Sequence, residues 1–386
     1  MFAQVLPSCK GRHIWPIGSA PGAENIGLVL YFGSRAQLSD GDKHRELQSK
    51  FPGAVVCGCS TGGQISGNAI VDDAVVAMGF AFERTNIRLA SADLANPAES
   101  HACGELLGRA LAGDDGLAGV FVLADGLNVN GNELIAGLIA TLGDEIPITG
   151  GMACDGTAFE RTLVAAGDLP RPNVVAAIGF YGLAFRMGYG IGDGWQVFGP
   201  HRSVTRSSGN RVYDVDGAPI LELYRRYLGD EEFAGLPMTG LRYPLQINHP
   251  ETPNKKVIRA VLGVDHDDGS MYFGGDIQVG SVVQLMRGNF ERLINGAGQA
   301  AQTVKDVVDP DDPHGAVAIL VSCIGRRILL GSNTEDEVAA VTQKLTDEMP
   351  RIGFYSLGEI SPYPGTSCAG LHNQTMTIVT FSESAG

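Results

Sequence analysis

Three short stretches bounded by glycine hold the residues of this sequence that are best suited to binding chemistry. They read GCSTGG at 58–63, GMACDG at 151–156 and GFYSLG at 353–358. The first combines a thiol, two hydroxyls and main-chain N–H groups without any bulky side chain, which suits a small polar or anionic group. A turn that only needs positive φ at its glycines would have the same composition. The pattern alone leaves both interpretations open.

The glycine spacing does not extend to a nucleotide-binding motif. A phosphate-binding loop needs Lys and then Ser or Thr directly after the second glycine, whereas here Gln64, Thr157 and Glu359 follow. No G-x-G-x-x-G opens a helix after the first predicted strand, which argues against a dinucleotide site. We therefore do not expect nucleotide hydrolysis.

Cysteine and histidine are the residues that could hold a metal or act as a nucleophile. Cys57 and Cys59 are too close together for the usual zinc knuckle, and no H-E-x-x-H or C-x-x-C-H occurs. Non-covalent haem needs only one axial ligand, so the eight histidines remain candidates. Cys59 with His372 would be a thiolate and its base, and a cysteine in a turn near a helix N-terminus would have a lowered pKa. No motif of a cysteine hydrolase surrounds Cys59, so we expect a binding protein and not an enzyme.

Composition limits the class of protein and its partners. The chain has 386 residues, 44% of them hydrophobic and 18% charged, which indicates two or three folded domains. A net charge of −15 repels nucleic acid and anionic lipid, so neither is an expected partner. The seven cysteines show no disulfide framework, the start shows no signal peptide, and the longest apolar run, 174–185, is too short to span a bilayer. These features predict a cytoplasmic protein.

Apolar runs and helical spacing predict the elements around the glycine turns. Buried strands are expected at 27–33 and 119–126, and a strand pair or core segment at 174–185. Apolar stripes predict helices at 133–143, ending at Gly143, at 281–294 and at 334–349, the last opening with a Thr334/Glu337 capping box. A short helix is expected within 220–228, near a domain boundary at 210–230, and a hairpin-like exposed loop at 247–256.

The same order of elements recurs along the chain. Residues 27–63, 119–156 and 316–358 each read as strand, helix, strand and glycine turn. This order predicts a repeated α/β plan whose glycine turns meet around one cavity. Chance recurrence is the competing explanation, because the chain contains 53 glycines.

Several stretches together resemble the FIST family of sensory domains. They are GCSTGGQISG (58–67), VLADGLNVNGNEL (122–134), PITGGMACDG (147–156), the run 197–229, GDIQVGSVVQLMR (275–287), GFYSLGEISP (353–362) and LHNQTMTIV (371–379). The resemblance implies a FIST N-terminal domain at 25–220 and a FIST C-terminal domain at 221–380. The fold expected is two packed α/β domains, with mixed sheets flanked by helices and a ligand cleft formed by the glycine-rich turns.

The resemblance also implies a function. FIST domains are sensors of small ligands in signalling, and members are proposed to bind metabolites such as amino acids. The run 274–301 is similar to a stand-alone group that senses nitric oxide through non-covalent haem and regulates a partner histidine kinase. We therefore expect a haem b sensor of nitric oxide acting on a separate histidine kinase or other signalling protein, with a haem-free metabolite sensor as the alternative.

Site residues follow from these motifs. We expect the cleft to be lined by Gly58, Cys59, Ser60, Thr61, Gly62, Gly151, Asp155, Tyr355, Glu359, His372 and Asn373. In an amino-acid sensor the turn amides would hold the carboxylate, and Asp155 or Glu359 the ammonium group. In a haem sensor His372 or His249 would be the axial ligand, with Tyr355 or Cys59 as weaker candidates.

Overall fold

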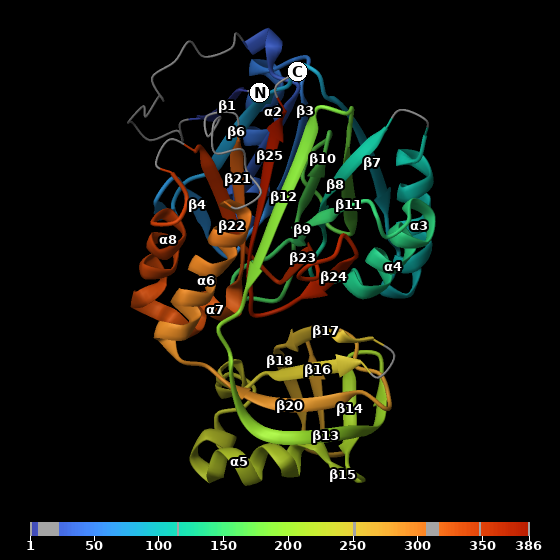
Figure 1. Cartoon of the computed structure of the whole chain (residues 1–386), viewed down its shortest axis with the longest axis vertical. Coiled ribbons are helices and arrows are strands. Elements are labelled where there is room, and N and C mark those ends of the chain that lie inside the picture. Colours follow the sequence, from blue (N-terminus) through green and yellow to red (C-terminus); the bar gives the residue numbers. More distant parts are fainter. Residues whose placement is uncertain are drawn as a thin grey trace.

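The computed structural model describes residues 2–6, 23–113, 116–249, 252–305, 316–346 and 349–384. They form an upper body built from three sheets and a smaller lower lobe beneath it (Figure 1). The lower lobe comprises residues 196–287, and the upper body is made by the chain before and after it. Mixed sheets flanked by helices confirm the predicted α/β class.

The upper body consists of three repeats of one plan. The first contains β2 (Leu28–Gly33), α1 (Arg35–Leu38), α2 (Asp42–Lys50), β3 (Val55–Ser60), β4 (Gln64–Ser66), β5 (Ala69–Val71), β6 (Val76–Ala81) and β7 (Asn86–Asp93). The second contains α3 (Ser100–Leu111), β8 (Leu117–Ala124), α4 (Gly131–Leu142), β9 (Ile148–Met152), β10 (Val164–Ala166), β11 (Val174–Tyr181) and β12 (Phe185–Gly192). The third contains α6 (Phe290–Lys305), β21 (Val317–Cys323), α7 (Ile324–Leu330), α8 (Thr334–Thr342), β22 (Arg351–Ser356), β23 (Gly358–Pro362), β24 (Ala369–His372) and β25 (Met376–Glu383).

Each repeat forms the centre of one sheet; the first two repeats lend strands to both other sheets, and the third lends β23 and β24 to the sheet of the second. The central parallel pairs are β2 with β3, β8 with β9, and β21 with β22. The strand after each pair crosses to a neighbouring sheet, so β4 pairs with β22, β10 with β3, and β23 with β9. The last strands cross the other way, since β7 pairs with β11 and β12 with β25. The predicted repeats are confirmed, and the three sheets are interlocked.

The three glycine turns meet where these strands cross. Each turn donates at least one main-chain hydrogen bond to another turn, so that the bonds close a ring. Gly62 N–H donates to the Tyr355 carbonyl at 2.8 Å, and Leu357 N–H donates to the Met152 carbonyl at 3.2 Å. Cys154 N–H completes the ring by donating to the Ser60 carbonyl at 2.8 Å. The turns therefore pack against one another, and the predicted cavity between them is replaced by direct contact.

Glycine allows the central strands to approach closely in every repeat. A Cβ atom on Gly58 would lie 2.3 Å from the carbonyl oxygen of Tyr31, its register partner on β2. One on Gly150 would lie 1.9 Å from the carbonyl of Val122, and one on Gly353 2.3 Å from that of Leu320, again the paired residues. No Cβ fits at such distances, so these glycines are required by packing.

Aromatic side chains from all three sheets fill the centre of the upper body. Phe32 of the first repeat and Phe354 of the third have ring centroids 4.4 Å apart. Phe121 of the second repeat meets Phe381 of the third edge to face, with centroids 5.9 Å apart. Because all four rings are fully buried in one apolar cluster, the repeats share a single core.

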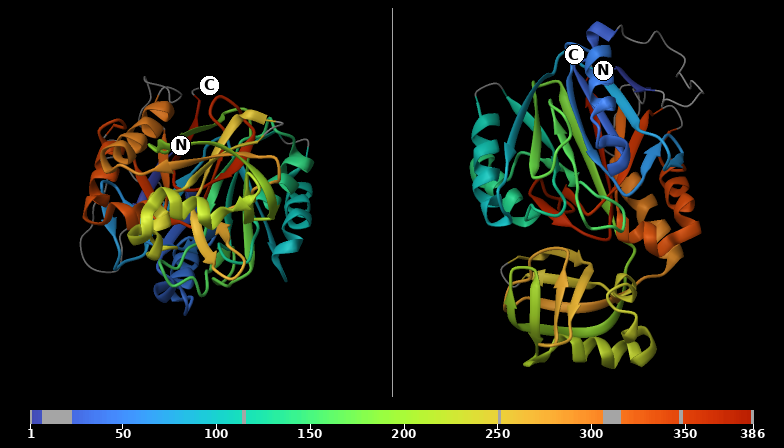
Figure 2. Two further views of the ribbon diagram at one scale, coloured as in Figure 1. Left: turned by 90° about the horizontal axis from the view of Figure 1, so that it is seen from below. Right: turned by 180° about the vertical axis from the view of Figure 1, so that it is seen from behind.

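The lower lobe is a curved sheet with a helical segment, kinked at Gly229, beside it (Figure 2). Its strands are β13 (Gln196–Ser208), β14 (Arg211–Val215), β15 (Ala218–Pro219), β16 (Leu245–His249), β17 (Thr252–Arg259), β18 (Val261–Asp265), β19 (Ser270–Phe273) and β20 (Val282–Arg287). The helix is α5 (Ile220–Ala234), and Ile220, Leu221 and Tyr224 pack into the lobe's own apolar core. The lobe is thus a separately packed unit under the upper body.

Most predicted elements are confirmed. The strands at 27–33 and 119–126 and the helices at 133–143 and 220–228 all form. The loop predicted at 247–256 is mostly strand, because β16 and β17 pair there, and its tip at 250–251 lies outside the described residues. The helix predicted at 281–294 is instead β20 followed by α6, because 282–287 pairs with both β13 and β16. The helix at 334–349 ends at Thr342, and Glu337 binds Arg326 instead of capping the helix.

The chain divides between the two lobes at other positions than the domain limits derived from the sequence. The sequence-derived limits, 25–220 and 221–380, divide the chain at the start of α5, inside the lower lobe. The structural division lies at 196 and 287, where the chain enters and leaves that lobe (Figure 1).

Among the described residues, no helix is long and apolar enough to cross a membrane.

The glycines of the central strands give a direct test of the packing. Gly353→Ala should lower the free energy of unfolding by about 1–3 kcal/mol or more, because the new methyl group meets a main-chain carbonyl. Gly53→Ala is the matched control, since a Cβ there meets nothing within 4 Å. Urea unfolding of both variants measures the difference, and equal midpoints would contradict the packing argument.

Candidate ligand site

In the described structure, most hydrogen-bonding groups of the first glycine turn are paired with other parts of the chain. Gly58, Cys59 and Ser60 belong to β3, and the N–H groups of Ser60, Thr61 and Gly62 donate to the carbonyls of Leu163, Gly33 and Tyr355. The Ser60 hydroxyl accepts from the N–H of Leu163, and the Thr61 hydroxyl donates to the Gly33 carbonyl. The expectation that these amides hold a carboxylate is therefore wrong, because strand crossing uses them.

The cysteines of this region are buried thiols. Cys59 is fully buried, and burial raises its pKa well above the ordinary value. The expected lowering of this pKa is wrong, since Cys59 lies in the middle of a sheet and not at a helix N-terminus. Burial also raises the pKa of Cys154 to about 12. Neither thiol is poised to act as a thiolate nucleophile.

The two carboxylates expected to bind an ammonium group hold the protein's own main chain. Asp155 accepts from the N–H groups of Phe159, Glu160 and Arg161 and so closes the loop after the second turn. Glu359 accepts from the Ser356 hydroxyl at 2.6 Å and from the hydroxyl and N–H of Thr375. Burial raises the Glu359 pKa from 4.5 to about 8, so this side chain is largely protonated near neutral pH.

Tyr355 and Gly151 are also internal. The Tyr355 hydroxyl donates to Glu337, which forms a fully buried ion pair with Arg326 at 2.7 Å. Gly151 pairs with Glu359 between β9 and β23, and a Cβ on it would lie 2.8 Å from Val321. These residues position the crossing of the three sheets.

The two histidines expected to hold iron differ in what the structure describes. His372 is buried, and its Nε2 lies 2.9 Å from the carbonyl oxygen of Ser361, which can only accept a hydrogen bond. Burial lowers its pKa from 6.5 to about 4, so the ring is neutral and donates through Nε2. The His249 main chain belongs to β16, and its side chain lies outside the described residues.

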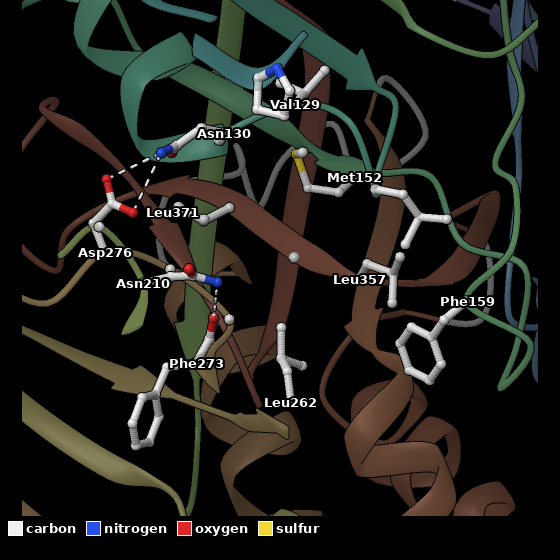
Figure 3. A pocket seen from close by; sticks show the side chains of 18 residues that line it. Val129, Asn130, Met152, Phe159, Asn210, Leu262, Phe273, Asp276, Leu357 and Leu371 are labelled. Atoms are coloured by element: carbon white, nitrogen blue, oxygen red, sulfur yellow. Dashed lines mark hydrogen bonds between the residues drawn. The ribbon is translucent and has the colours of Figure 1, made fainter. Parts of the chain in front are cut away.

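A cleft between the upper body and the lower lobe is one of the cavities to which both parts contribute (Figure 3). Its wide part has a volume of about 380 Å³. The upper body supplies the loop before α4, Met152 and Leu357, and the lower lobe supplies Leu262 and the segment 273–276. We call this cavity, together with the apolar part described next, the interlobe cleft.

The apolar part adjoins the wide part, and the two share Phe159, Leu262 and Leu357. It has a volume of about 260 Å³. Its walls come from the start of α7, the loop after the second turn, and residues 237–241 and 260–262 of the lower lobe. Thr157 and Asn373 bring the only hydroxyl and carboxamide side chains among its described lining residues. Large apolar surface with few polar groups is typical of a small-molecule site.

Polar side chains join the two lobes across the cleft. Asn130 caps α4 with its Oδ1 and donates through Nδ2 to both oxygens of Asp276, at 3.1 and 3.3 Å (Figure 3). Arg259 of β17 is fully buried and donates to the Leu371 carbonyl at 2.8 Å and to Asn132 Oδ1 at 3.3 Å. A buried apolar cluster also joins the lobes, since Ile258 and Met286 of the lower lobe pack with Leu293 and Leu330 of the upper body.

The segment 371–375 brings the upper body to this interface. His372 and Glu359 fix its two ends through the Ser361 carbonyl and Thr375. Gln374 has a φ of 58° and donates to the Leu241 carbonyl of the lower lobe at 3.3 Å. His372 therefore orients the segment.

Asn373 is the exceptional residue of this segment. Its side chain is 1% exposed, and neither Oδ1 nor Nδ2 has a hydrogen-bond partner among the described residues. It lies between Gly274 of the lower lobe and Gly358 of the upper body, where Cβ atoms would lie 2.5 Å and 3.6 Å from its carboxamide. Each buried polar group without a partner costs about 1–3 kcal/mol, so such a group in a native fold needs an explanation.

Comparison with known proteins identifies the family. A model of the FIST N domain matches residues 27–218, and a model of the FIST C domain matches residues 221–362. The chain belongs to the FIST family. The predicted family is confirmed, and FIST domains are generally small-ligand sensors in signalling.

Relatives add little to this assignment. An uncharacterized protein of Methanocaldococcus jannaschii is 26% identical over 71% of this chain and 55% of its own length. An uncharacterized protein of Mycobacterium bovis is 29% identical over 50% of this chain and 49% of its own. The chain thus spans about half the length of these curated relatives. A chorismatase crystal structure aligns with 100% of this chain and 98% of its own at 9% identity and a TM-score of 0.37, too distant to transfer any active-site residue.

Of the sequence-predicted site residues of this FIST protein, Asn373 is the one that lines a described part of the interlobe cleft. The residues that sequence reasoning missed are Asn130, Asp276 and the pair Gly274–Gly275. All four lie within stretches that resemble the family, but the lower lobe had to be in place before their role as cleft wall was visible. The Asn-Gly-Asn run at 130–132 was the available local signal, as a helix N-cap.

The raised pKa of Glu359 leads to a prediction of how the free energy of unfolding depends on pH. Its pKa is about 8 in the fold and near 4.5 when exposed, so the unfolded chain loses the proton first. The contribution of Glu359 to the free energy of unfolding should therefore fall as pH rises from about 5 to about 8, by up to about 1.4 kcal/mol per pH unit, and then level off. Urea unfolding of the native protein and Glu359→Gln across this range measures it. Parallel curves would contradict the prediction.

Replacing the buried polar side chain of Asn373 with an apolar one should make the protein more stable. Asn373→Leu should raise the free energy of unfolding by about 1 kcal/mol or more, because it removes two unpaired polar atoms at nearly constant size. Asn130→Leu is the matched control on the same cleft, and it should lower the free energy by about 1–2 kcal/mol through loss of the helix cap. If thermal unfolding shows both variants destabilised alike, Asn373 is an ordinary structural residue.

Proposed function

We propose that this FIST protein is a sensor whose small ligand binds in the interlobe cleft and changes how the lower lobe sits against the upper body. The observation that carries the proposal is Asn373, whose buried carboxamide lacks hydrogen-bond partners in the described structure at the junction of the two lobes. A ligand that supplies those partners gains energy that the ligand-free protein lacks.

The shape of the cleft supports a sensing role. Both parts are lined from the upper body and from the lower lobe, so a bound molecule touches both. A ligand with different affinity for two lobe arrangements shifts their populations, and that shift is a signal. Their combined size suits a molecule of metabolite size.

We propose a binding role without catalysis. The cysteines nearest to the glycine turns are buried, with raised thiol pKa values, and Asp155 and Glu359 are occupied by main-chain and hydroxyl donors. The sensor would pass its state to a separate signalling protein in the cytoplasm, with a histidine kinase as the partner that the family resemblance suggests. The outer faces of the two lobes change their relative position on binding and offer what such a partner would recognise.

Haem remains the other candidate ligand. The described residues that line the interlobe cleft include no histidine, and the Cys323 thiol at the apolar part is buried with a raised pKa. His372 donates its Nε2 hydrogen to Ser361 and would lose that bond on binding iron. The described cleft therefore does not fit a histidine-ligated haem, and we favour a haem-free metabolite sensor.

A ligand screen tests the proposal. Thermal unfolding of the purified protein with amino acids, their uncharged derivatives and other small metabolites should reveal at least one compound that raises the melting temperature. The same compound should give no shift with Asn373→Leu and an unchanged shift with Asn86→Leu, an exposed asparagine on β7 outside the described cleft lining.

Haem is included in the screen and is followed by visible absorption. We expect no saturable Soret band. A saturable band that shifts with nitric oxide and disappears with His249→Ala would overturn the metabolite proposal in favour of the gas sensor. A shift that survives Asn373→Leu would place the site outside the interlobe cleft.

A further inference from the structure

We infer that the ligand of the interlobe cleft is an uncharged molecule with an apolar body and an adjacent N–H and C=O, as in a lactam or a cyclic dipeptide. The inference rests on the proposed function and specifies its ligand. It replaces the zwitterionic amino acid that the sequence suggested.

The walls of the apolar part argue against a charged ligand. Its described lining residues include no Asp, Glu, Lys, Arg or His. Leu241, Ile324 and Ile328 are among the apolar side chains that surround it. Moving an ionised carboxylate or ammonium group from water into such surroundings is strongly unfavourable without a partner of opposite charge. A neutral apolar body gains free energy there instead.

Asn373 specifies the polar end of the ligand. A carboxamide carries a donor and an acceptor side by side, and in this protein both are unpaired and buried. A carboxylate alone can only accept and an ammonium group alone can only donate, so either alone would leave one atom of Asn373 unsatisfied. A zwitterion carries both, but its two charges would lie beside walls whose described residues supply no charged partner. An amide with N–H and C=O on the same side satisfies both. The nearby Gln374 Oε1, also unpaired in the described structure, is a further acceptor.

The position of Gly274 indicates what the ligand must displace to reach the carboxamide of Asn373. The carboxamide of Asn373 lies over Gly274, at a distance that leaves no room for any side chain there. The segment Gly274–Gly275 therefore covers Asn373 from the lower lobe, and it also lines the wide part of the cleft. The ligand takes the place of this segment against Asn373, so binding and movement of the lower lobe are one event.

Matched probes test the chemical class. Calorimetric titration of the full chain compares cyclo(leucyl-prolyl), which has one cis-amide N–H beside a carbonyl, with its N-methyl derivative and with linear zwitterionic leucyl-proline. We expect the cyclic dipeptide to bind, the N-methyl form to bind about tenfold more weakly or worse, and the linear dipeptide not to bind. Asn373→Leu should abolish binding, and Asn373→Asp should weaken it at least about tenfold.

The outcomes separate this inference from the proposed function. Binding of leucine or leucyl-proline that is lost with Asn373→Leu would overturn the uncharged class while leaving a sensor that binds in the interlobe cleft. Binding of the cyclic dipeptide that is unchanged in Asn373→Leu would overturn the assignment of Asn373 as the anchor. Failure of the cyclic dipeptide to bind the native protein would overturn the inference. Thermal unfolding of each variant confirms beforehand that it is folded.

Discussion

The ring of main-chain hydrogen bonds between the three glycine turns is the constraint on which the rest of the upper body depends. Each turn lies where one strand leaves its own sheet and joins the next, so the ring fixes the sheets to each other at one point. The glycines of β3, β9 and β22 let the paired strands come close enough for this crossing. The phenylalanines between the sheets then pack in a space whose size the crossing determines. The helices pack on the outer faces of the sheets, which this core leaves uncovered.

This constraint also explains where a ligand can and cannot bind. Main-chain groups at the crossing are already paired, and hydroxyls and carboxylates around it complete the pairing. Polar residues there specify one arrangement of the strands, which is a common use of buried hydrogen-bond networks. The carboxamide of Asn373, which has no partner among the described residues, lies outside this crossing. It belongs to the segment 371–375, which Glu359 holds in place through Thr375. A rigid centre thus supports a group that has no hydrogen-bond partner among the described residues.

Local sequence patterns predicted the elements, and tertiary pairing decided the rest. The apolar stripe of 133–143 and the glycine after it were enough for α4, because the helix and its end are local properties. The helix that the apolar stripe at 281–294 predicts is wrong, because 282–287 pairs with two neighbouring strands and becomes part of a sheet. The glycine spacing predicts that the three turns are equivalent, yet sequence cannot show that the main-chain groups of Gly58, Cys59 and Ser60 pair with other strands. The family motif points to Asn373, but only the folded structure shows that its carboxamide is buried without a partner among the described residues.

The pairing of β1 (Phe2–Leu6) has a consequence for the symmetry of the molecule. β1 pairs with β6 as β7 pairs with β11 and β12 pairs with β25, so the three repeats form a closed circle with no structural first member. The connection from β7 to α3 and the connection from β12 to α6 are equivalent in that circle, yet the first takes a few residues and the second contains the whole lower lobe. The lobe is therefore an insertion into one of otherwise equivalent joints, and it converts a symmetric scaffold into a molecule with a single distinguished face (Figure 2).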